Sequence, residues 1–321
     1  MGTGAEYLGI VCFSYVFFCI TQSFIAGLRS VEVARIGLYV SLCSLFTNIF
    51  LNYCLIYGKL GFPEYGVAGA AIATLIARIV ETTIITLYVF LYDKRLAFRP
   101  RDLLSGDRLL LGDLIPYGLP IPAGQLVWAV NTMVSSAIMG RQSEEGSVAA
   151  MSIAQTINSL AYVCMNGMSG AVGIITGKTI GAGREDKMRE YSKTVQIIFL
   201  MLGIFTGLTL YLLRDSFISL YDVSDAAVAE AVKYINVIAV TMVGTCYQVS
   251  VLFGLVKSGG DITFVFKNDS FFVFVVVLPS AIIATLLHAP AWVVFSCLKC
   301  DQILKCFVAI VKVNSYNWMK N

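Results

Sequence analysis

The chain has 321 residues, of which 58% are hydrophobic and only 13% are charged, and its mean hydropathy is +0.79. A soluble domain carries about a quarter charged residues, which solvate its water-facing surface, so this composition excludes an ordinary soluble protein. The formal net charge of +3 is small. It supplies no concentrated basic face, and this excludes nucleic acid as a partner.

Long apolar stretches run through the whole chain. About nine of them reach the ~20 residues that a helix needs to cross a hydrocarbon core of ~30 Å. They are continuously apolar rather than alternating, which predicts helices and excludes barrel strands. The expected spans are 4–26, 36–58, 67–92, 114–139, 147–175, 192–213, 232–256, 270–288 and 291–313. We therefore expect an all-α integral membrane protein that crosses the bilayer about nine times.

The first three spans, within residues 1–92, carry polar side chains that are costly in lipid and therefore candidates for function. Asn48 and Asn52 lie four residues apart, on one face of the second span. Their carbonyl oxygens suit Na⁺, although amides cannot titrate, and Thr74 of the third span adds a hydroxyl. Hydrogen bonding between helices is the structural alternative. Arg78 and Glu81 are three residues apart, and we interpret them as a structural ion pair.

Residues 93–113 are basic and partly amphipathic, and we expect a cytoplasmic linker that lies on the membrane surface. The six spans that follow, within residues 114–321, contain polar and aromatic side chains at helical spacing. These candidates for lining a substrate cavity come from three spans: Gln125, Trp128 and Asn131; Gln155, Asn158, Tyr162 and Asn166; and Thr245 and Gln248. The alternative is again packing between helices. Only Asp113, at an entrance, is an acid in the fourth or seventh span.

The placement of positive charge predicts the orientation in the membrane. With the 27–35 loop inside and strict alternation after it, sixteen Lys and Arg residues fall on the cytoplasmic side and four on the other. Membrane proteins keep such residues inside. The N-terminus is therefore expected outside and the C-terminus inside.

Metal and catalytic sites are not expected. The nine cysteines lie in apolar runs, where Cys acts as a small hydrophobe, and His288 is the only histidine. A membrane enzyme would need clustered His, Asp or Glu at the bilayer edge, which the sequence lacks. We expect no enzyme, no catalytic residue, no bound metal and no cofactor.

Several segments resemble one known family. They are NIFLNYCLIYGKLGFPEYGVAGAAIATLIAR (48–78), GLP (118–120), SVAAMSIAQTI (147–157), GKTIGAGRED (177–186), LVKSGGDITF (255–264) and VKVNSYNWMKN (311–321). Together they resemble the multidrug and toxic compound extrusion (MATE) transporters, within the larger group that includes lipid-linked-oligosaccharide flippases. No single segment is unique to the family, but the set is specific in its order and covers nearly the whole chain.

The resemblance implies twelve helices in two six-helix lobes around a central cavity. On that plan the chain corresponds to spans four to twelve, an N-terminally truncated form. Residues 1–92 are then the second half of the N-terminal lobe, and 114–321 are the C-terminal six-helix lobe. The resemblance further implies that Asn48, Asn52 and Thr74 belong to an ion-binding site, and that the three polar sets line the substrate cavity. Some members place an acid inside the fourth or seventh span, which this chain does not.

The expected function is a Na⁺- or H⁺-coupled antiporter that exports drug-like or metabolic organic compounds, often cationic. We expect a multi-pass monomer in the cytoplasmic membrane of a bacterium, in contact with lipids. One alternative is a flippase for a lipid-linked polysaccharide, which would need more intramembrane cations than Arg78, Lys299 and Lys305. The other is a non-functional truncated fragment.

Overall fold

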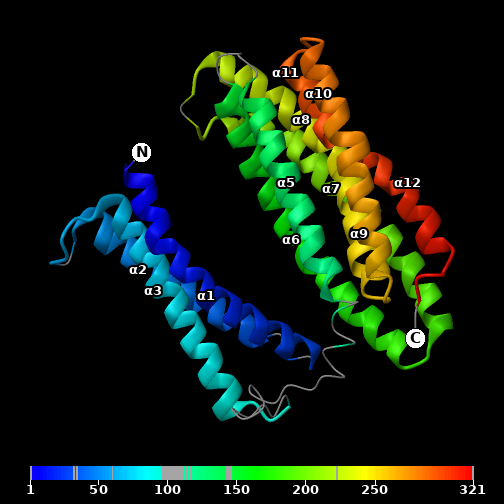
Figure 1. Ribbon diagram of the computed structural model, residues 1–321, viewed down its shortest axis with the longest axis horizontal. Coiled ribbons are helices and arrows are strands. Elements are labelled where there is room, and N and C mark those ends of the chain that lie inside the picture. The colour runs from blue at the N-terminus through cyan, green and yellow to red at the C-terminus, as the bar shows by residue number, and fades with distance from the viewer. Residues whose placement is uncertain are drawn as a thin grey trace. The chain divides into compact units, whose positions relative to one another are not determined.

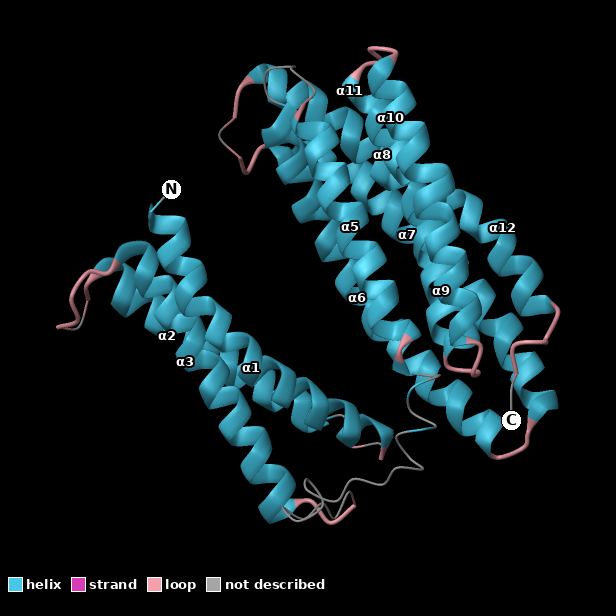
Figure 2. Ribbon diagram, viewed as in Figure 1, coloured by secondary structure: helices cyan, strands magenta, loops and turns pink. Residues whose placement is uncertain are grey.

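The computed structural model describes residues 2–31, 33, 35–59, 61–95, 112, 115, 118–141, 147–221 and 223–319. All regular secondary structure in these ranges is helical (Figure 2). Contacts between Cα atoms divide the chain into two compact units, unit 1 at 1–107 and unit 2 at 108–321. The boundary falls inside the 93–113 segment, most of which lies outside the described residues.

Unit 1 is a three-helix arrangement in which α3 packs against both other helices (Figure 1). Its helices are α1 (Gly2–Ser30), α2 (Arg35–Tyr57) and α3 (Gly66–Leu87), and α3 continues as the π-helical segment η1 (Tyr88–Tyr92). A Cβ atom on Gly69 of α3 would lie 2.6 Å from the carbonyl oxygen of Leu55 on α2. The two backbones touch, which the absence of a side chain at Gly69 permits.

Unit 2 surrounds one central helix, α8, which packs against α6, α7, α11 and α12. Its apolar stretch is 78% buried, against 22–33% for the other six long apolar helices of the described chain. The helices are α5 (Pro120–Gly140), α6 (Ser147–Gly181), α7 (Glu185–Ile218), α8 (Asp225–Val249), η3 (Ser250–Lys257), α9 (Ile262–Phe271), η4 (Phe272–Val277), α10 (Leu278–Leu286), α11 (Ala291–Lys299) and α12 (Asp301–Asn314). The segments η3 and η4 are π-helical continuations of α8 and α9.

Two turns of unit 2 each contain a pair of glycines, Gly181 with Gly183 and Gly259 with Gly260. Only Gly183 (φ 69°) and Gly260 (φ 102°) adopt a positive φ. Gly181 instead ends helix α6. Gly259 is required for space, because a Cβ there would lie 2.3 Å from the buried indole of Trp318.

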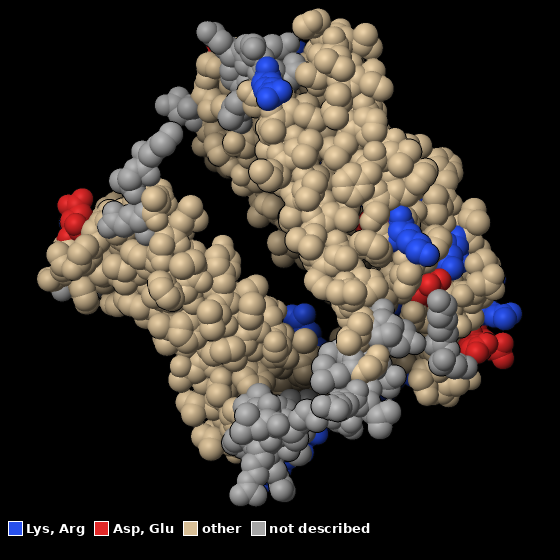
Figure 3. All heavy atoms as spheres, in the orientation of Figure 1, with Lys and Arg blue, Asp and Glu red and all other residues tan. Residues whose placement is uncertain are grey.

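The all-α membrane fold expected from the sequence is confirmed. Seven helices of the described chain are long and apolar enough to cross a bilayer. They coincide with seven of the expected spans. The other two expected spans correspond to α5, which carries Gln125 and Asn131, and to α11 and α12, which are separated by a turn at Cys300. In Figure 3 the long sides of the units show mainly uncharged atoms, as lipid contact requires.

Candidate functional site

The paired amides of unit 1 contact each other along one face of α2. The Asn52 Nδ2 group donates a hydrogen bond of 3.0 Å to Asn48 Oδ1. The Asn52 Oδ1 atom is buried, and no hydrogen-bond donor reaches it. A buried acceptor without a partner is uncommon, because it loses its hydrogen bonds to water on burial and gains none in the protein. This oxygen is therefore available to a cation or to a further donor.

Thr74 lies at the level of this pair along the helix axes. The antiparallel α2 and α3 touch at Ser44, which donates to the Ala77 carbonyl, and at Leu55, whose carbonyl faces Gly69. Asn48 and Thr74 fall between these two contacts. The Thr74 hydroxyl donates within its own helix to the Ala70 carbonyl at 2.9 Å, so its oxygen keeps lone pairs that can accept a second partner.

Arg78 and Glu81 form the ion pair that their spacing predicts. The Glu81 carboxylate is 3% exposed and pairs with Arg78, whose side chain is 35% exposed. The Ser44 hydroxyl donates to the same carboxylate oxygen at 3.4 Å. Because both charges have partners within unit 1, this contact stabilises the packing of α2 on α3.

The candidate cavity residues of α5 and α6 are largely accessible in unit 2. Trp128 is 66% exposed. The amides Gln125, Gln155 and Asn166 are exposed as well, and Asn131, Asn158 and Tyr162 are half-buried. An amide facing lipid would lose its hydrogen bonds to water at a cost of several kcal/mol. Contact with water or with other polar groups would avoid this cost.

Thr245 and Gln248, the remaining candidates, are buried on α8 and face α12. The Thr245 hydroxyl and the Gln248 Nε2 group both donate to Gln302 Oε1, at 3.2 and 3.0 Å. The Nε2 group of Gln302 donates in turn to Asp301 Oδ1 at 2.9 Å. These two residues thus belong to a hydrogen-bond network inside unit 2.

The same network contains three charged residues that sequence reasoning did not connect. Lys305 Nζ lies 2.9 Å from Asp269 Oδ1 and 3.0 Å from Asp301 Oδ2. The side chains of Lys305 and Asp301 are 7% and 6% exposed, and that of Asp269 is 21% exposed. Asp269 directly precedes the expected span 270–288, and Asp301 lies inside the expected span 291–313. The signal was present: Asp301 and Lys305 are four apart within an apolar stretch, where ionisable residues are functional candidates.

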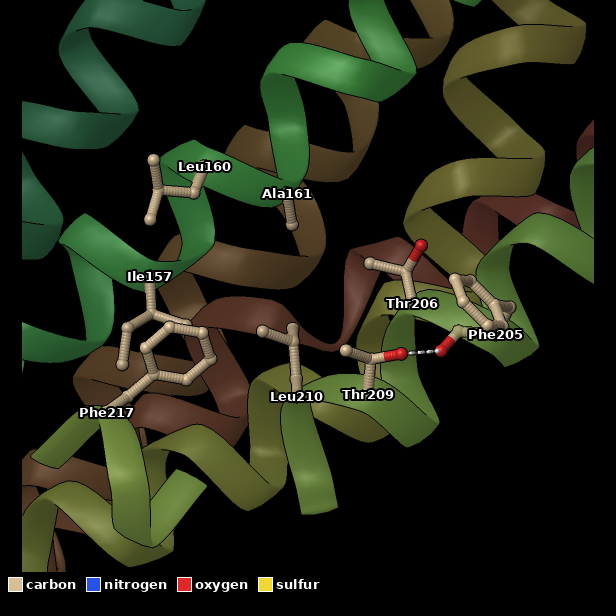
Figure 4. Close-up of a pocket in the computed structure, with 8 residues that line it drawn as sticks. All are labelled: Ile157, Leu160, Ala161, Phe205, Thr206, Thr209, Leu210 and Phe217. Atoms are coloured by element: carbon tan, nitrogen blue, oxygen red, sulfur yellow. Dashed lines mark hydrogen bonds between the residues drawn. The ribbon is translucent and has the colours of Figure 1, made fainter. Parts of the chain in front are cut away.

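One pocket of unit 2 lies between α6 and α7 and is apolar (Figure 4). Its lining consists of Ile157, Leu160, Ala161, Phe205, Thr206, Thr209, Leu210 and Phe217. The Thr209 hydroxyl donates to the backbone carbonyl of Phe205 at 2.8 Å, so it is satisfied inside α7. None of the candidate cavity residues lines this pocket, which suits a hydrocarbon chain rather than a polar ligand.

Within the described residues, no group of three or more His, Cys, Asp or Glu side chains could hold a metal ion. A transition-metal site, which needs such a set, is therefore not formed there. Alkali cations differ in this respect, because neutral amide and hydroxyl oxygens can serve as their ligands.

Known proteins are similar to this chain in sequence and in fold. The MatE family model matches residues 1–54 and 120–283. A probable multidrug resistance protein NorM of Photorhabdus laumondii subsp. laumondii is 30% identical over 279 residues, which are 85% of this chain and 59% of that protein. The probable NorM of Thermotoga maritima is 28% identical over 229 residues, 71% of this chain and 48% of that protein.

A solved structure of a transporter of the MOP superfamily from Pyrococcus furiosus has a similar fold. Its TM-score is 0.86 at 21% identity, over 98% of this chain and 70% of that one. The chain thus spans about half the length of the curated relatives it matches. The family match covers well over half of the residues, in both units. The chain therefore belongs to the MatE family, whose members are membrane transporters and not enzymes.

Proposed function

We propose that this chain acts in cation-coupled export of drug-like or metabolic organic compounds across the cytoplasmic membrane of a bacterium. An inward flow of Na⁺ or H⁺ drives the export. The bacterial relatives are named as probable multidrug resistance proteins, which supports the substrate class. The coupling ion and the substrate are parts of the proposal.

The observation that carries the proposal is the unpartnered Asn52 Oδ1 atom in unit 1. The hydrogen bond to Asn48 fixes the Asn52 amide, so that its oxygen points away from its partner. A fixed, desolvated carbonyl oxygen suits a hard cation such as Na⁺. We assign Asn48, Asn52 and Thr74 to a coupling-ion site, in which the amides act as ligands and do not exchange protons.

The substrate contacts are assigned to the accessible polar faces of α5 and α6. The exposed ring of Trp128 offers a π face to an organic cation, an interaction worth about 0.5–2 kcal/mol. The amides of Gln125, Asn131, Gln155, Asn158 and Asn166 and the phenol of Tyr162 supply adaptable hydrogen bonds. Thr245 and Gln248 are instead bonded to Gln302 inside unit 2, and we assign them a supporting place behind this set.

The state of the intramembrane cations favours an exporter over a flippase for a lipid-linked polysaccharide. A site that binds phosphate needs Lys or Arg side chains that are not already paired with carboxylates. Arg78 and Lys305 are engaged by carboxylates, and Lys299 lies 5.9 Å from the ring centroid of Phe295. Two of the three cations are thus already neutralised.

A binding experiment tests the proposal, because an antiported cation and substrate must antagonise each other's binding. The purified chain in detergent is titrated with ethidium by fluorescence, with and without NaCl and at two pH values. We expect NaCl or acid to weaken ethidium binding. Asn52→Ala is expected to remove the NaCl effect while ethidium still binds.

The control is Thr47→Ala on the same helix, since the Thr47 hydroxyl is bonded to the Cys43 carbonyl at 2.8 Å. It should behave like the parent chain. Ethidium affinity that neither NaCl nor acid changes would contradict cation coupling. A failure to bind ethidium or another lipophilic cation would contradict the substrate class.

A further inference from the structure

We propose that unit 2 binds an aminophospholipid, a lipid whose head group carries a phosphate and a primary ammonium, at the groove between α6 and α7. One acyl chain occupies the apolar pocket between these helices, and the head group contacts Arg214 and Asp215 of α7. This inference does not depend on the proposed coupling ion or exported substrate, because it involves none of the residues assigned to them.

The pocket between α6 and α7 is a groove with a buried apolar floor and an exposed apolar rim. Ile157 of α6 and Leu210 of α7 are buried and form its floor. Leu160 and Phe205, which also line it, are 60% and 68% exposed. In Figure 4 the side chains of both helices face a shared space. The groove is therefore open at the surface and lined almost entirely by hydrocarbon.

The groove lies in the part of α7 that crosses the hydrocarbon core. No charged residue occurs on α7 between Lys193 and Arg214, a stretch of about 30 Å at 1.5 Å per residue, which matches the thickness of the core. Phe205 and Arg214 are about 14 Å apart along the axis. At this depth water lacks polar partners, and an empty groove forfeits van der Waals contacts. A lipid chain is therefore the occupant that fits the groove.

Arg214 lies at the end of this apolar stretch, on the side of α7 that carries pocket residues. Leu210, Arg214 and Phe217 follow one another at separations of four and three, which places them along one side of the helix. The guanidinium is fixed, because Nη1 donates to Asn236 Oδ1 on α8 at 2.9 Å and Cζ lies 4.6 Å from the ring centroid of Tyr211. Among the described residues its hydrogen bonds use Nη1 and Nε. The N–H groups of Nη2 can therefore donate to a phosphate.

Asp215 adds a negative group beside this cation. Its side chain is 75% exposed, and its Oδ1 atom accepts a long contact of 3.4 Å from Arg214 Nε. The two side chains thus present opposite charges side by side at the edge of the hydrocarbon core. A phosphate linked to a primary ammonium is complementary to this pair. A trimethylammonium group has no N–H to donate, so the carboxylate favours the aminophospholipid over a choline lipid.

Native mass spectrometry of the purified, delipidated full chain tests the proposal. The chain is titrated with phosphatidylethanolamine or phosphatidylcholine carrying the same acyl chains. The parent chain is expected to bind phosphatidylethanolamine about fivefold more tightly, the effect of roughly one net hydrogen bond. Asp215→Asn should abolish this preference and leave the affinity for phosphatidylcholine unchanged. Arg214→Gln should weaken the binding of both lipids, since both carry the phosphate.

Matched variants control for the head group and for the groove. Asp225→Asn removes another exposed carboxylate, at the start of α8, and should keep the preference. Ala161→Phe fills the pocket and should weaken the binding of both lipids. Leu208→Phe enlarges an exposed side chain of α7 that does not line the pocket, and should leave both affinities unchanged.

Three results would overturn the proposal. The first is equal affinity of the parent chain for the two lipids. The second is a preference that survives in Asp215→Asn or is lost equally in Asp225→Asn. The third is binding that Ala161→Phe leaves unchanged. Because Asp215 is exposed and phosphatidylcholine binding reports on the folded groove, a loss confined to phosphatidylethanolamine cannot arise from misfolding.

Discussion

At the scale of single residues, buried charge decides which side chains tolerate change. Glu81 is almost fully buried, whereas the side chain of Arg78 is 35% exposed and also lies 5.1 Å from the ring centroid of Phe18. Loss of Arg78 leaves a buried carboxylate with only a weak hydrogen bond from Ser44. Loss of Glu81 leaves a partly exposed cation that keeps its contact with the ring of Phe18.

We therefore predict an asymmetric effect on stability. Arg78→Ala should lower the free energy of unfolding by roughly 3 kcal/mol, and Glu81→Ala by less, because the ring of Phe18 still contacts the cation. The double variant should be more stable than Arg78→Ala alone, because the unpaired carboxylate is gone. Thermal unfolding of the chain in detergent measures this, with the exposed Lys187→Ala as control. Equal losses in the two single variants would contradict the argument.

Residue spacing predicted contacts within one helix much better than contacts between helices. The pairs Asn48–Asn52 and Arg78–Glu81 follow directly from separations of four and three. The meeting of Asp269 with Lys305 depends on how α9 and α12 are rotated against each other, and no local pattern encodes that rotation. The positions of Thr245 and Gln248 against Gln302 have the same origin.

At the scale of elements, glycine sets how closely helices approach α8. A Cβ atom on Gly207 of α7 would lie 2.5 Å from the Ala239 carbonyl oxygen. On the other side, a Cβ on Gly244 would lie 2.4 Å from the carbonyl oxygen of Gln302 on α12. Both obstacles are backbone atoms, which cannot move without shifting a helix. Helices in lipid associate through such small residues.

Gly244→Ala is therefore predicted to destabilise unit 2 by about 1–3 kcal/mol, because α12 must move away from α8. The matched control is Gly170→Ala on α6, where no atom lies within 4 Å of the added Cβ. That change should be neutral or stabilising by up to about 1 kcal/mol, the helix propensity gained from Gly to Ala. The midpoint temperatures of thermal aggregation, measured for both variants and the parent chain, test this prediction. A control as unstable as Gly244→Ala would refute the packing explanation.

The ends of helices could be predicted where the length of an apolar stretch determines them. They could not be predicted where the local backbone geometry determines them. Seven spans follow from hydropathy alone. The turn at Cys300 was not predicted, because residues 291–313 read as one continuous apolar stretch. This break gives α12 its own N-terminus beside Asp301, so the unpredicted feature lies at the overlooked charged cluster.

At the scale of the whole molecule, the distribution of Lys and Arg residues predicts how the chain is oriented in the membrane. The turn around Arg184 carries several basic residues, and the connection between α7 and α8, residues 219–224, carries none. Positive charge is retained on the cytoplasmic side during insertion. The turn at Gly183 is therefore expected inside the cell, and the segment after Tyr221 outside.

Epitope insertions test this orientation in intact cells expressing the full chain. A tag after Gly183 should be reached by antibody only after permeabilisation, whereas a tag after Tyr221 should be reached without it. Between them α7, with 34 residues, extends about 50 Å at 1.5 Å per residue. It is long enough to cross ~30 Å of hydrocarbon once and reach into water on both sides. Labelling of both tags from the same side would mean that α7 does not cross. Reversed labelling would mean that the cationic turn was translocated against the charge rule.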